Sequence, residues 1–350
     1  MIKAYKPRNS RKVEFFDKLK RQETKPIIID AFKRQIKELF IIDNLEFVGQ
    51  EKKKIYGSKE FGNYKRLKAD SFKYYYYPWN NTLVKCVEEE DYFRLKTDRN
   101  RDLIREDEQK MLYDYKVAVF GMSVGSNISI AIAQAGISKN MVIADFDELD
   151  TTNMNRILAG VHQIGLNKTT IAARRIYEDN PFANVTVLDK GINKVLLEQL
   201  LKEGKIECIV EEIDDMPMKI EIRKLAIKYK VPVLMITDNG DRAVLHIERY
   251  DLGYKKIFEE DIKYWDKKMK KCKTPKDFAD IIINNIVGDK SKVDPRMMDS
   301  VMKVFQRKFV SWPQLGSAAL LGSVAVTVAI KQILRGEDKK LFRKEYLRIY

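Results

Sequence analysis

The sequence contains little cysteine and little histidine. Its three cysteines, Cys86, Cys208 and Cys272, lie far apart, and none belongs to a C-x-x-C pair. Such isolated cysteines support neither a disulfide framework nor a cysteine-type zinc site, so we expect no zinc. The chain has only two histidines, His162 and His246, which leaves few side chains to act as the general base of a hydrolase.

The sequence also lacks a long hydrophobic segment. Its first residues, MIKAYKPRNSRK, do not contain the apolar stretch of a secretory signal, and we therefore expect a cytoplasmic protein. The longest apolar run, at 315–330, is rich in glycine, alanine and serine, and it falls short of the roughly 20 residues that cross a bilayer. We expect this run to form a buried, closely packed helix, and we expect no membrane partner.

Positive charge, in contrast, is abundant. The 350 residues include 66 lysines and arginines but 51 aspartates and glutamates, which gives a net charge of +15. This charge would attract an acidic partner such as RNA, a nucleotide or a membrane surface. The basic residues are spread along the whole chain, however, as solvated surface lysines also are. The hydrophobic content of 45% is enough for the core of one large or two smaller α/β domains.

From residue 116 onward, strand-like and helix-like segments alternate. Strands are predicted in KVAVF, MVIADFD, CIVEEID and VPVLMIT and at 185–188, and helices are predicted at 127–135, 168–178, 196–201 and 218–229. This alternation is typical of an α/β fold with a doubly wound, mostly parallel, Rossmann-like sheet. We assign 92–350 to this domain, with a charged helical insertion at about 253–308, and 1–91 to a basic and aromatic accessory region.

The segment KVAVFGMSVGSNISIAIA, at 116–133, fits two interpretations. Its G-x-S-x-G pattern resembles a nucleophile elbow, and the order Ser123, Asp214, His246 fits a hydrolase triad. However, His246 lies within AVLHIERYD, which predicts a strand, and neither an HGG-type oxyanion segment nor a βα unit precedes Gly121. The alternative is a strand, a tight turn and a helix start that cradle the phosphates of a nucleotide. We favour the nucleotide interpretation.

The nucleotide interpretation gives each residue of the turn a role. Gly121 and Gly125 would supply unusual backbone angles, whereas Ser123 and Ser126 occupy places where a G-x-G-x-x-G turn has glycines. An acidic residue roughly 20 positions after such a turn holds ribose hydroxyls, and Asp145 in VIADFDELD meets that requirement. These residues alone leave ATP, NAD and the absence of a ligand open.

The segments that follow carry a more specific resemblance. DFDELDTTNMNR, GLNK, NP and VEEIDD together resemble the signature of the ThiF/MoeB and ubiquitin-activating-enzyme superfamily, whose members adenylate a carboxylate with ATP and Mg²⁺. Downstream, VPVLMITDNGD and WPQLGSAALLGSVAVTVAIKQIL resemble the later strand and the C-terminal helix of that family. Upstream, Arg99-Asn-Arg101 resembles a segment whose arginine reaches the ATP of the partner subunit, so Arg101 is the candidate for this role in a homodimer. The resemblance runs from about residue 92 to the end, without the insertion, and favours free-standing bacterial members.

The resemblance also implies roles for polar side chains around the turn. Arg156 and Lys168 would contact the triphosphate, and Asn153 would help to position it. Asp214 would hold Mg²⁺, for which one or two carboxylates and phosphate oxygens suffice, and Asp145 would hold the ribose. Each residue, taken singly, also fits an ordinary surface charge or a cap. Their ordered combination favours a nucleotide site.

Three features depart from the family or leave its chemistry open. The turn Gly121-Met-Ser-Val-Gly125-Ser is shorter than the family's glycine-rich turn, and the paired cysteines that bind zinc in many members are absent. Some members pass the activated carboxylate to a cysteine, and Cys272 lies in the comparable insertion, where neighbouring lysines would favour its thiolate. A lone cysteine in a lysine-rich run is also commonly incidental.

The function implied by the resemblance is an ATP-dependent adenylyltransferase. It would activate the C-terminal carboxylate of a ubiquitin-like or sulfur-carrier protein as an acyl adenylate and release pyrophosphate. One alternative resembles the tRNA threonylcarbamoyladenosine dehydratases, with the basic and aromatic accessory region binding tRNA. Another is a non-catalytic nucleotide-binding module. An NAD-dependent dehydrogenase fits the glycine turn but gives Asn153, Arg156 and Lys168 no role.

Overall fold

The computed structural model describes residues 8–10 and 25–348. The chain divides into two compact units. The first holds the residues up to Gln109 together with Asn180–Phe182, and the second holds Lys110–Asp179 and Ala183–Tyr350. Residues 92–109, which the sequence analysis assigned to the second domain, thus belong to the first unit.

The first unit contains a four-stranded sheet in the order β1-β3-β4-β2. Strands β3 and β4 pair antiparallel, and β2 pairs parallel to β4. The strands are β1 (Arg8–Ser10), β2 (Ile27–Asp30), β3 (Phe72–Tyr77) and β4 (Thr82–Val87). The helices are α2 (Phe32–Asp43), α3 (Lys52–Tyr56), α4 (Lys59–Leu67) and α5 (Glu89–Thr97), with 3-10 turns η1 (Leu45–Phe47) and η2 (Asp98–Asn100).

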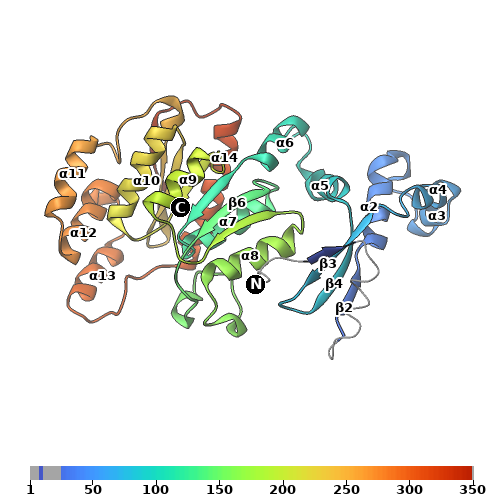
Figure 1. The fold of residues 1–350 in the computed structure, drawn as a ribbon, viewed down its shortest axis with the longest axis horizontal. Helices are drawn as coiled ribbons and strands as arrows, with labels where there is room; N and C mark the ends of the chain where they lie inside the picture. The colour runs from blue at the N-terminus through green and yellow to red at the C-terminus, as the bar shows by residue number, and fades with distance from the viewer. Residues whose placement is uncertain (1–7, 11–24, 349–350) are drawn as a thin grey trace. The chain divides into compact units, whose positions relative to one another are not determined.

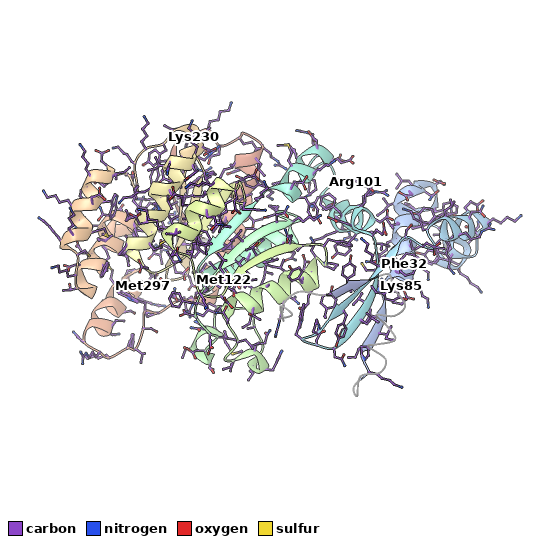
Figure 2. All side chains as sticks on the ribbon, viewed as in Figure 1. Phe32, Lys85, Arg101, Met122, Lys230 and Met297 are labelled. Atoms are coloured by element: carbon purple, nitrogen blue, oxygen red, sulfur yellow. The ribbon has the colours of Figure 1, made fainter. Side chains whose placement is uncertain are left out.

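The aromatic run of the first unit forms part of its core. Tyr75, Tyr76 and Tyr77 of β3 are buried, with exposed fractions of 1%, 5% and 6%. On β4, Lys85 places its Nζ 4.6 Å from the centre of the Phe32 ring, so its ammonium group lies against an aromatic surface (Figure 2). The three tyrosines therefore stabilise the unit by packing and do not present their rings to nucleic-acid bases.

The second unit is built on a seven-stranded sheet in the order β11-β10-β9-β8-β5-β6-β7. Figure 1 labels β6 of this sheet. The five strands from β7 to β9 are parallel, whereas β10 and β11 are antiparallel additions at one edge. The strands are β5 (Val117–Phe120), β6 (Asn140–Ala144), β7 (Asn184–Leu188), β8 (Cys208–Glu211), β9 (Val233–Asn239), β10 (Arg242–Glu248) and β11 (Phe342–Leu347). The predicted α/β fold with a mostly parallel sheet is confirmed.

Helices cover both faces of this sheet. α7 (Val124–Gln134) packs against α8 (Lys168–Asp179) and α14 (Gly316–Leu334), and α14 also packs against β9 and β10. On the other face, α9 (Lys194–Lys202) and α10 (Met216–Tyr229) bury leucine and isoleucine side chains against Ala118 and Phe120 of β5. The sheet is thus a buried layer, as parallel sheets require. Helix α6 (Glu106–Asp114) and the turns η3 (Thr151–Asn153) and η4 (Val161–Gln163) complete the connections.

Helix α14 is the apolar run at 315–330 with one further turn. By length and composition it could cross a membrane, and it is the one such helix among residues 8–10 and 25–348. Half of its most apolar window is buried, and Gly322 lets the helix approach Ile236 of β9, because a Cβ there would lie 2.7 Å from the Ile236 Cγ2. The expected close packing is confirmed on this face, whereas Leu320 and Val324 on the other face are exposed.

The region at 253–308 folds mainly as helices. Its elements are α11 (Ile262–Lys271), α12 (Pro275–Ile281), the π-helical turn η6 (Ile282–Val287), η7 (Lys290–Lys292) and α13 (Pro295–Phe305), and the turn η5 (Tyr250–Leu252) leads into it. Phe258 and the fully buried Trp265 pack against Met216 and Ile220 of α10. The insertion therefore covers the α10 side of the sheet.

Candidate functional site

The carboxyl ends of β5 and β8 lie at the point where the strand order of the sheet reverses. β5 pairs with β6 on one side and with β8 on the other, so the chain moves outward to β7 and then returns to the centre. In open α/β sheets, ligands bind in the crevice at such a switch point. The turn at 121–126 follows β5, and the loop at 212–215 follows β8, so both lie at this point.

The turn after β5 requires glycine at two positions for different reasons. Gly121 has a φ of +89°, and a Cβ at this position would lie 2.4 Å from the carbonyl oxygen of Glu212. Gly125, which we expected to supply an unusual backbone angle, lies instead in helix α7 without a positive φ. Its lack of a side chain lets α7 approach β5, because a Cβ would lie 2.9 Å from the Val119 Cγ1.

Asp145, the expected ribose ligand, holds the turn itself. Its two carboxylate oxygens accept hydrogen bonds from the backbone N–H of Met122, at 2.5 Å, and of Asp147, at 2.8 Å. Burial raises the pKa of Asp145, and these two hydrogen bonds oppose that shift. The carboxylate thus fixes the backbone between β5 and α7, a role that the sequence did not indicate. Its contact with a ribose stays a prediction.

Arg156 connects the segment TTNMNR to the turn. Its Nε donates a hydrogen bond of 2.9 Å to Ser123 Oγ, and its Nη1 donates one of 3.0 Å to Asn155 Oδ1. Burial lowers the pKa of Arg156, and the charges of Asp238 and Asp214 oppose that shift. Since the guanidinium stays charged, its partial burial strengthens its interaction with an anion. The structure therefore brings Ser123 and Arg156 together beside two carboxylates.

Four further polar residues of this region have structural partners. The side chain of Lys168 is 7% exposed, and its Nζ donates a hydrogen bond of 2.7 Å to Asp147. Asn153 Oδ1 accepts from the backbone N–H of Asp150 at 3.2 Å and closes the turn η3. Asn127 of α7, which the sequence analysis did not single out, donates a hydrogen bond of 2.5 Å to the carbonyl oxygen of Arg156. Ser126 Oγ donates to the Ser123 carbonyl at 3.0 Å.

Two aspartates lie at the carboxyl ends of adjacent strands. Asp214 follows β8 and is exposed, whereas its neighbour Asp215 caps α10 by accepting a hydrogen bond of 2.7 Å from the N–H of Met218. Asp238, on β9, was missed by the sequence analysis. Its carboxylate oxygens are shielded from solvent and, within the described part of the chain, accept no hydrogen bond. A polar residue at the end of a parallel strand was the signal that could have identified it.

The donor chemistry of this site fits Mg²⁺ only together with a nucleotide. Among the described residues, no group of three or more histidine, cysteine or acidic side chains could hold a metal ion. Mg²⁺ in nucleotide sites is bound through one or two carboxylates plus phosphate oxygens and water. Asp214 and Asp238 supply carboxylates of that kind, so the residues fit a metal that arrives with ATP.

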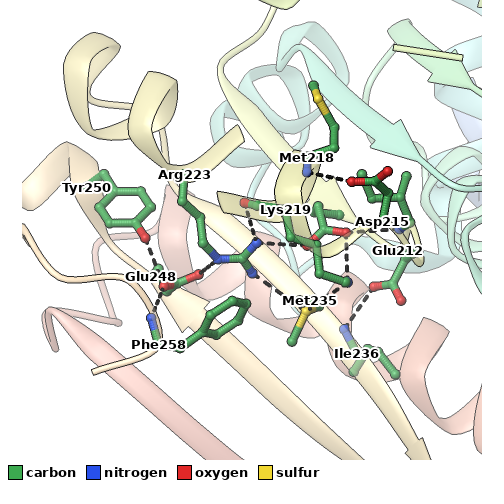
Figure 3. A network of polar contacts seen from close by, with 12 residues as sticks. Glu212, Asp215, Met218, Lys219, Arg223, Met235, Ile236, Glu248, Tyr250 and Phe258 are labelled. Carbon is green, nitrogen blue, oxygen red and sulfur yellow. Dashed lines mark hydrogen bonds and ion pairs between the residues drawn. The ribbon is translucent and has the colours of Figure 1, made fainter. Parts of the chain in front are cut away.

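Behind the loop at 212–215 lies a buried network of charges (Figure 3). Arg223 of α10 is fully buried and donates hydrogen bonds of 2.8 Å to Glu211 and 2.6 Å to Glu248. Lys219 adds a 2.9 Å ion pair to Glu211. Glu248 also accepts from Tyr250 Oη and from the N–H of Phe258 in the insertion. The network thus ties the end of β8 to α10, β10 and the insertion.

The structure does not assemble the alternative hydrolase triad. Ser123 Oγ accepts a hydrogen bond from Arg156, whereas His246 is buried in β10 with its Nε2 2.9 Å from the carbonyl oxygen of Ile286. The His246 ring lies between Phe258 and Phe342, with ring centres 5.8 Å and 6.2 Å away. Burial lowers the pKa of His246 well below its ordinary value. His246 is therefore a packed core residue and not a base for Ser123.

Two predicted site residues, Arg101 and Cys272, make contacts outside the region around the turn at 121–126. In the first unit, Arg101 is exposed and forms an ion pair with Asp98.

Cys272 caps the end of α11 and packs against the cluster around Trp265. Burial raises the pKa of Cys272, Asp277 adds to the increase, and Lys268 opposes it. This direction is opposite to the effect expected from its lysine neighbours, and a thioester role for Cys272 stays a prediction.

Comparison with known proteins gives the chain a family and relatives. Residues 97–347 match the sequence model of the ThiF family. An uncharacterized protein of Mycobacterium tuberculosis is 33% identical over 272 residues, which are 77% of this chain and 37% of that protein. The ubiquitin-like modifier-activating enzyme 5 of Caenorhabditis briggsae is 26% identical over 181 residues, which are 49% of this chain and 41% of that enzyme.

A third relative is also known as a structure. The tRNA threonylcarbamoyladenosine dehydratase of Escherichia coli is 28% identical over 133 residues, which are 37% of this chain and 48% of that enzyme. Its crystal structure in complex with AMP aligns with a TM-score of 0.52 at 18% identity and covers 72% of this chain and 99% of that chain. This structural likeness concerns the fold. The chain spans less than half the length of the three curated relatives.

Proposed function

Because the chain belongs to the ThiF family, we propose that it is an ATP-dependent adenylyltransferase that converts a carboxylate into an acyl adenylate and releases pyrophosphate. The observation that carries this proposal is the 2.9 Å hydrogen bond from Arg156 to Ser123 at the start of α7. It joins the glycine turn to the Asn-x-x-Arg segment at the switch point of the sheet. The AMP bound in the structure of the E. coli dehydratase supports an adenine nucleotide as the ligand.

The residues of the site can bind and orient ATP. During adenylation the carboxylate attacks the α-phosphorus, and fixed positive charges must stabilise the transferring phosphate. The N-terminus of α7 offers backbone N–H groups and the positive end of the helix dipole. Arg156 and the buried Lys168 add two cations, and Asp147 holds the Lys168 ammonium at 2.7 Å. Mg²⁺, when bound, neutralises phosphate charge, and Asp214 is its proposed ligand.

For the acceptor, we propose the C-terminal carboxylate of a ubiquitin-like or sulfur-carrier protein. The name of the C. briggsae relative assigns a ubiquitin-like modifier to that enzyme, and the resemblance in the DFDELDTTNMNR and VEEIDD segments supports a similar acceptor here. The proposal includes a cytoplasmic homodimer in which Arg101 reaches the nucleotide of the partner subunit. A second candidate acceptor is tRNA, which the dehydratase relative and the net charge of +15 favour.

A pyrophosphate-release assay tests the proposed reaction. The full chain is incubated with Mg-ATP and candidate carrier proteins, and the same carriers with an amidated C-terminus serve as the control. We expect release only with the free carboxylate, and Arg156→Ala should lower the rate by about 10²–10³-fold, as the loss of one fixed charge-stabilising donor does. Arg175→Ala is the matched control, because the Arg175 side chain is 62% exposed on α8.

The same assay separates the alternatives. Binding of tRNA that weakens steeply with salt, without release of pyrophosphate from any carrier, would favour the dehydratase-like function. ATP binding without pyrophosphate release in the presence of either kind of acceptor would favour a nucleotide-binding module. A rate that Arg156→Ala leaves unchanged would contradict the proposed site.

A further inference from the structure

Asp238 is a half-buried aspartate whose carboxylate oxygens have no hydrogen-bond partner among the described residues. Both of its carboxylate oxygens are shielded from solvent, and neither accepts a hydrogen bond within the described part of the chain. Burying a carboxylate without donors is unfavourable, so native proteins pair such groups with donors, cations or metal ions. A shielded carboxylate without hydrogen-bond donors therefore indicates that a cation binds beside it.

Asp238 lies on β9, and Asp214 lies in the loop after the adjacent strand β8. Ile209 of β8 pairs with Val233 of β9, and the sequence offset between these two residues equals the offset between Asp214 and Asp238. Beyond the paired residues, the N–H of Ile236 donates a 2.8 Å hydrogen bond to the Glu212 side chain, and Asp214 follows two residues later. The two carboxylates therefore stand at neighbouring carboxyl ends of parallel strands.

The alternation of side chains along β9 shows which face Asp238 occupies. Ile236 faces Gly322 of α14, and Asp238, two residues later, points to the same face. The first turn of α14 lies on this face, against the segment that carries Arg156, because a Cβ on Gly316 would lie 2.3 Å from the carbonyl oxygen of Asn155. Asp238 thus faces the nucleotide site and not the α10 side of the sheet.

The charges around Asp238 support a cation site. Arg156 interacts electrostatically with both Asp238 and Asp214, and these two carboxylates repel each other. The hydrogen bonds of the Arg156 guanidinium go to Ser123, Asn155 and the Thr152 carbonyl, so its charge acts on the aspartates without direct contact. If Arg156 turns to the phosphates of ATP, the two carboxylates lose this positive charge and need a replacement.

We propose that Asp238 is a second carboxylate ligand, with Asp214, for the Mg²⁺ that accompanies ATP. This inference rests on the proposed nucleotide site. Mg²⁺ prefers oxygen ligands, retains several waters, and is commonly bound by one or two carboxylates together with phosphate oxygens. The ion would balance both carboxylates while Arg156 binds phosphate, and it would supply the partner that the Asp238 oxygens lack.

The test is the Mg²⁺ dependence of ATP binding, measured by calorimetry on the full chain. ATP is titrated into the wild type and Asp238→Asn at a series of Mg²⁺ concentrations and in EDTA. Asp241→Asn is the matched control, because Asp241 is an exposed aspartate in the turn that follows β9. We expect Asp238→Asn to raise the Mg²⁺ concentration for half-maximal enhancement of ATP affinity at least tenfold, with unchanged affinity in EDTA. Asp241→Asn should behave as the wild type does.

Three results would overturn the inference, and they differ from one another. If Asp238→Asn keeps the wild-type Mg²⁺ dependence, Asp238 is not a ligand, although the nucleotide site stands. If the variant loses the same affinity with Mg²⁺ and in EDTA, Asp238 acts through Arg156 and not through the metal. If the wild type binds no ATP under any condition, the proposed function fails as well. A second readout replaces Mg²⁺ with Mn²⁺ and records the electron paramagnetic resonance spectrum of the ATP complex. This spectrum should change in Asp238→Asn and stay the same in Asp241→Asn.

Discussion

Replacing Arg223 with methionine should destabilise the fold strongly. The Arg223 guanidinium is 0% exposed, lies between Glu211 and Glu248 at 2.8 Å and 2.6 Å, and places its Cζ 3.8 Å from the centre of the Phe258 ring. Methionine fills much of the same space without the charge. Glu211 would keep Lys219, but Glu248 would keep only the neutral donors Tyr250 and Phe258.

The expected loss follows from this imbalance. Removing one partner of a buried ion pair leaves an uncompensated buried charge and costs about 3–5 kcal/mol. Lys224→Met is the control on the next residue of α10. Lys224 pairs with Asp266 at 2.7 Å, but its side chain is 29% exposed, and partly exposed pairs contribute about 1 kcal/mol or less. The assay is urea unfolding at neutral pH. Equal losses in the two variants, both of about 1 kcal/mol or less, would refute the role assigned to the network.

Three further predictions concern single residues. Gly121→Ala should abolish ATP binding, because the added Cβ would lie 2.4 Å from the carbonyl oxygen of Glu212. Gly204 also has a positive φ but has open space around it, so Gly204→Ala should bind ATP normally. Calorimetry of the two variants tests this prediction. Burial raises the pKa of Asp238 to about 6. In EDTA, the folded state therefore binds a proton more tightly than the unfolded state, and the protein loses stability as pH rises from about 4 to about 6. Asp238→Asn should raise the free energy of unfolding by up to about 3 kcal/mol at pH 7.5 and by little at pH 4. Alkylation of Cys272, followed by mass spectrometry, should be no faster than that of a free thiol at pH 8, because its pKa is raised; fast alkylation would contradict this.

The parallel sheet could be predicted because its signal is local. Short apolar strands alternate with amphipathic helices, and the spacing of these segments is visible in the sequence. No strand was predicted at the charged segment before the C-terminus, yet Phe342–Leu347 forms β11 and pairs with β10. An edge strand contacts the sheet on one side only, so its sequence FRKEYL need not be apolar.

The glycine turn and its neighbours show the limit of sequence patterns at the site. Gly121 was expected to adopt a positive φ, and it does. The reason for Gly125 was wrong, because helix packing and not backbone angle requires it. The position of Asp238 at a strand end was visible in the sequence, but the burial of its carboxylate oxygens and of Arg223 was not, since it depends on strands and helices that are distant along the chain. Arg223 in MKIEIRKLAIKY fits an exposed helix position as well as a buried one.

The most direct test of the account is calorimetric binding of Mg-ATP and of NAD to the wild type and to Asp214→Ala. The account predicts that the wild type binds Mg-ATP, that the substitution weakens this binding, and that NAD does not bind. Binding of NAD, or Mg-ATP binding that Asp214→Ala leaves unchanged, would contradict it. If neither nucleotide binds, the turn at 121–126 is not a working phosphate site.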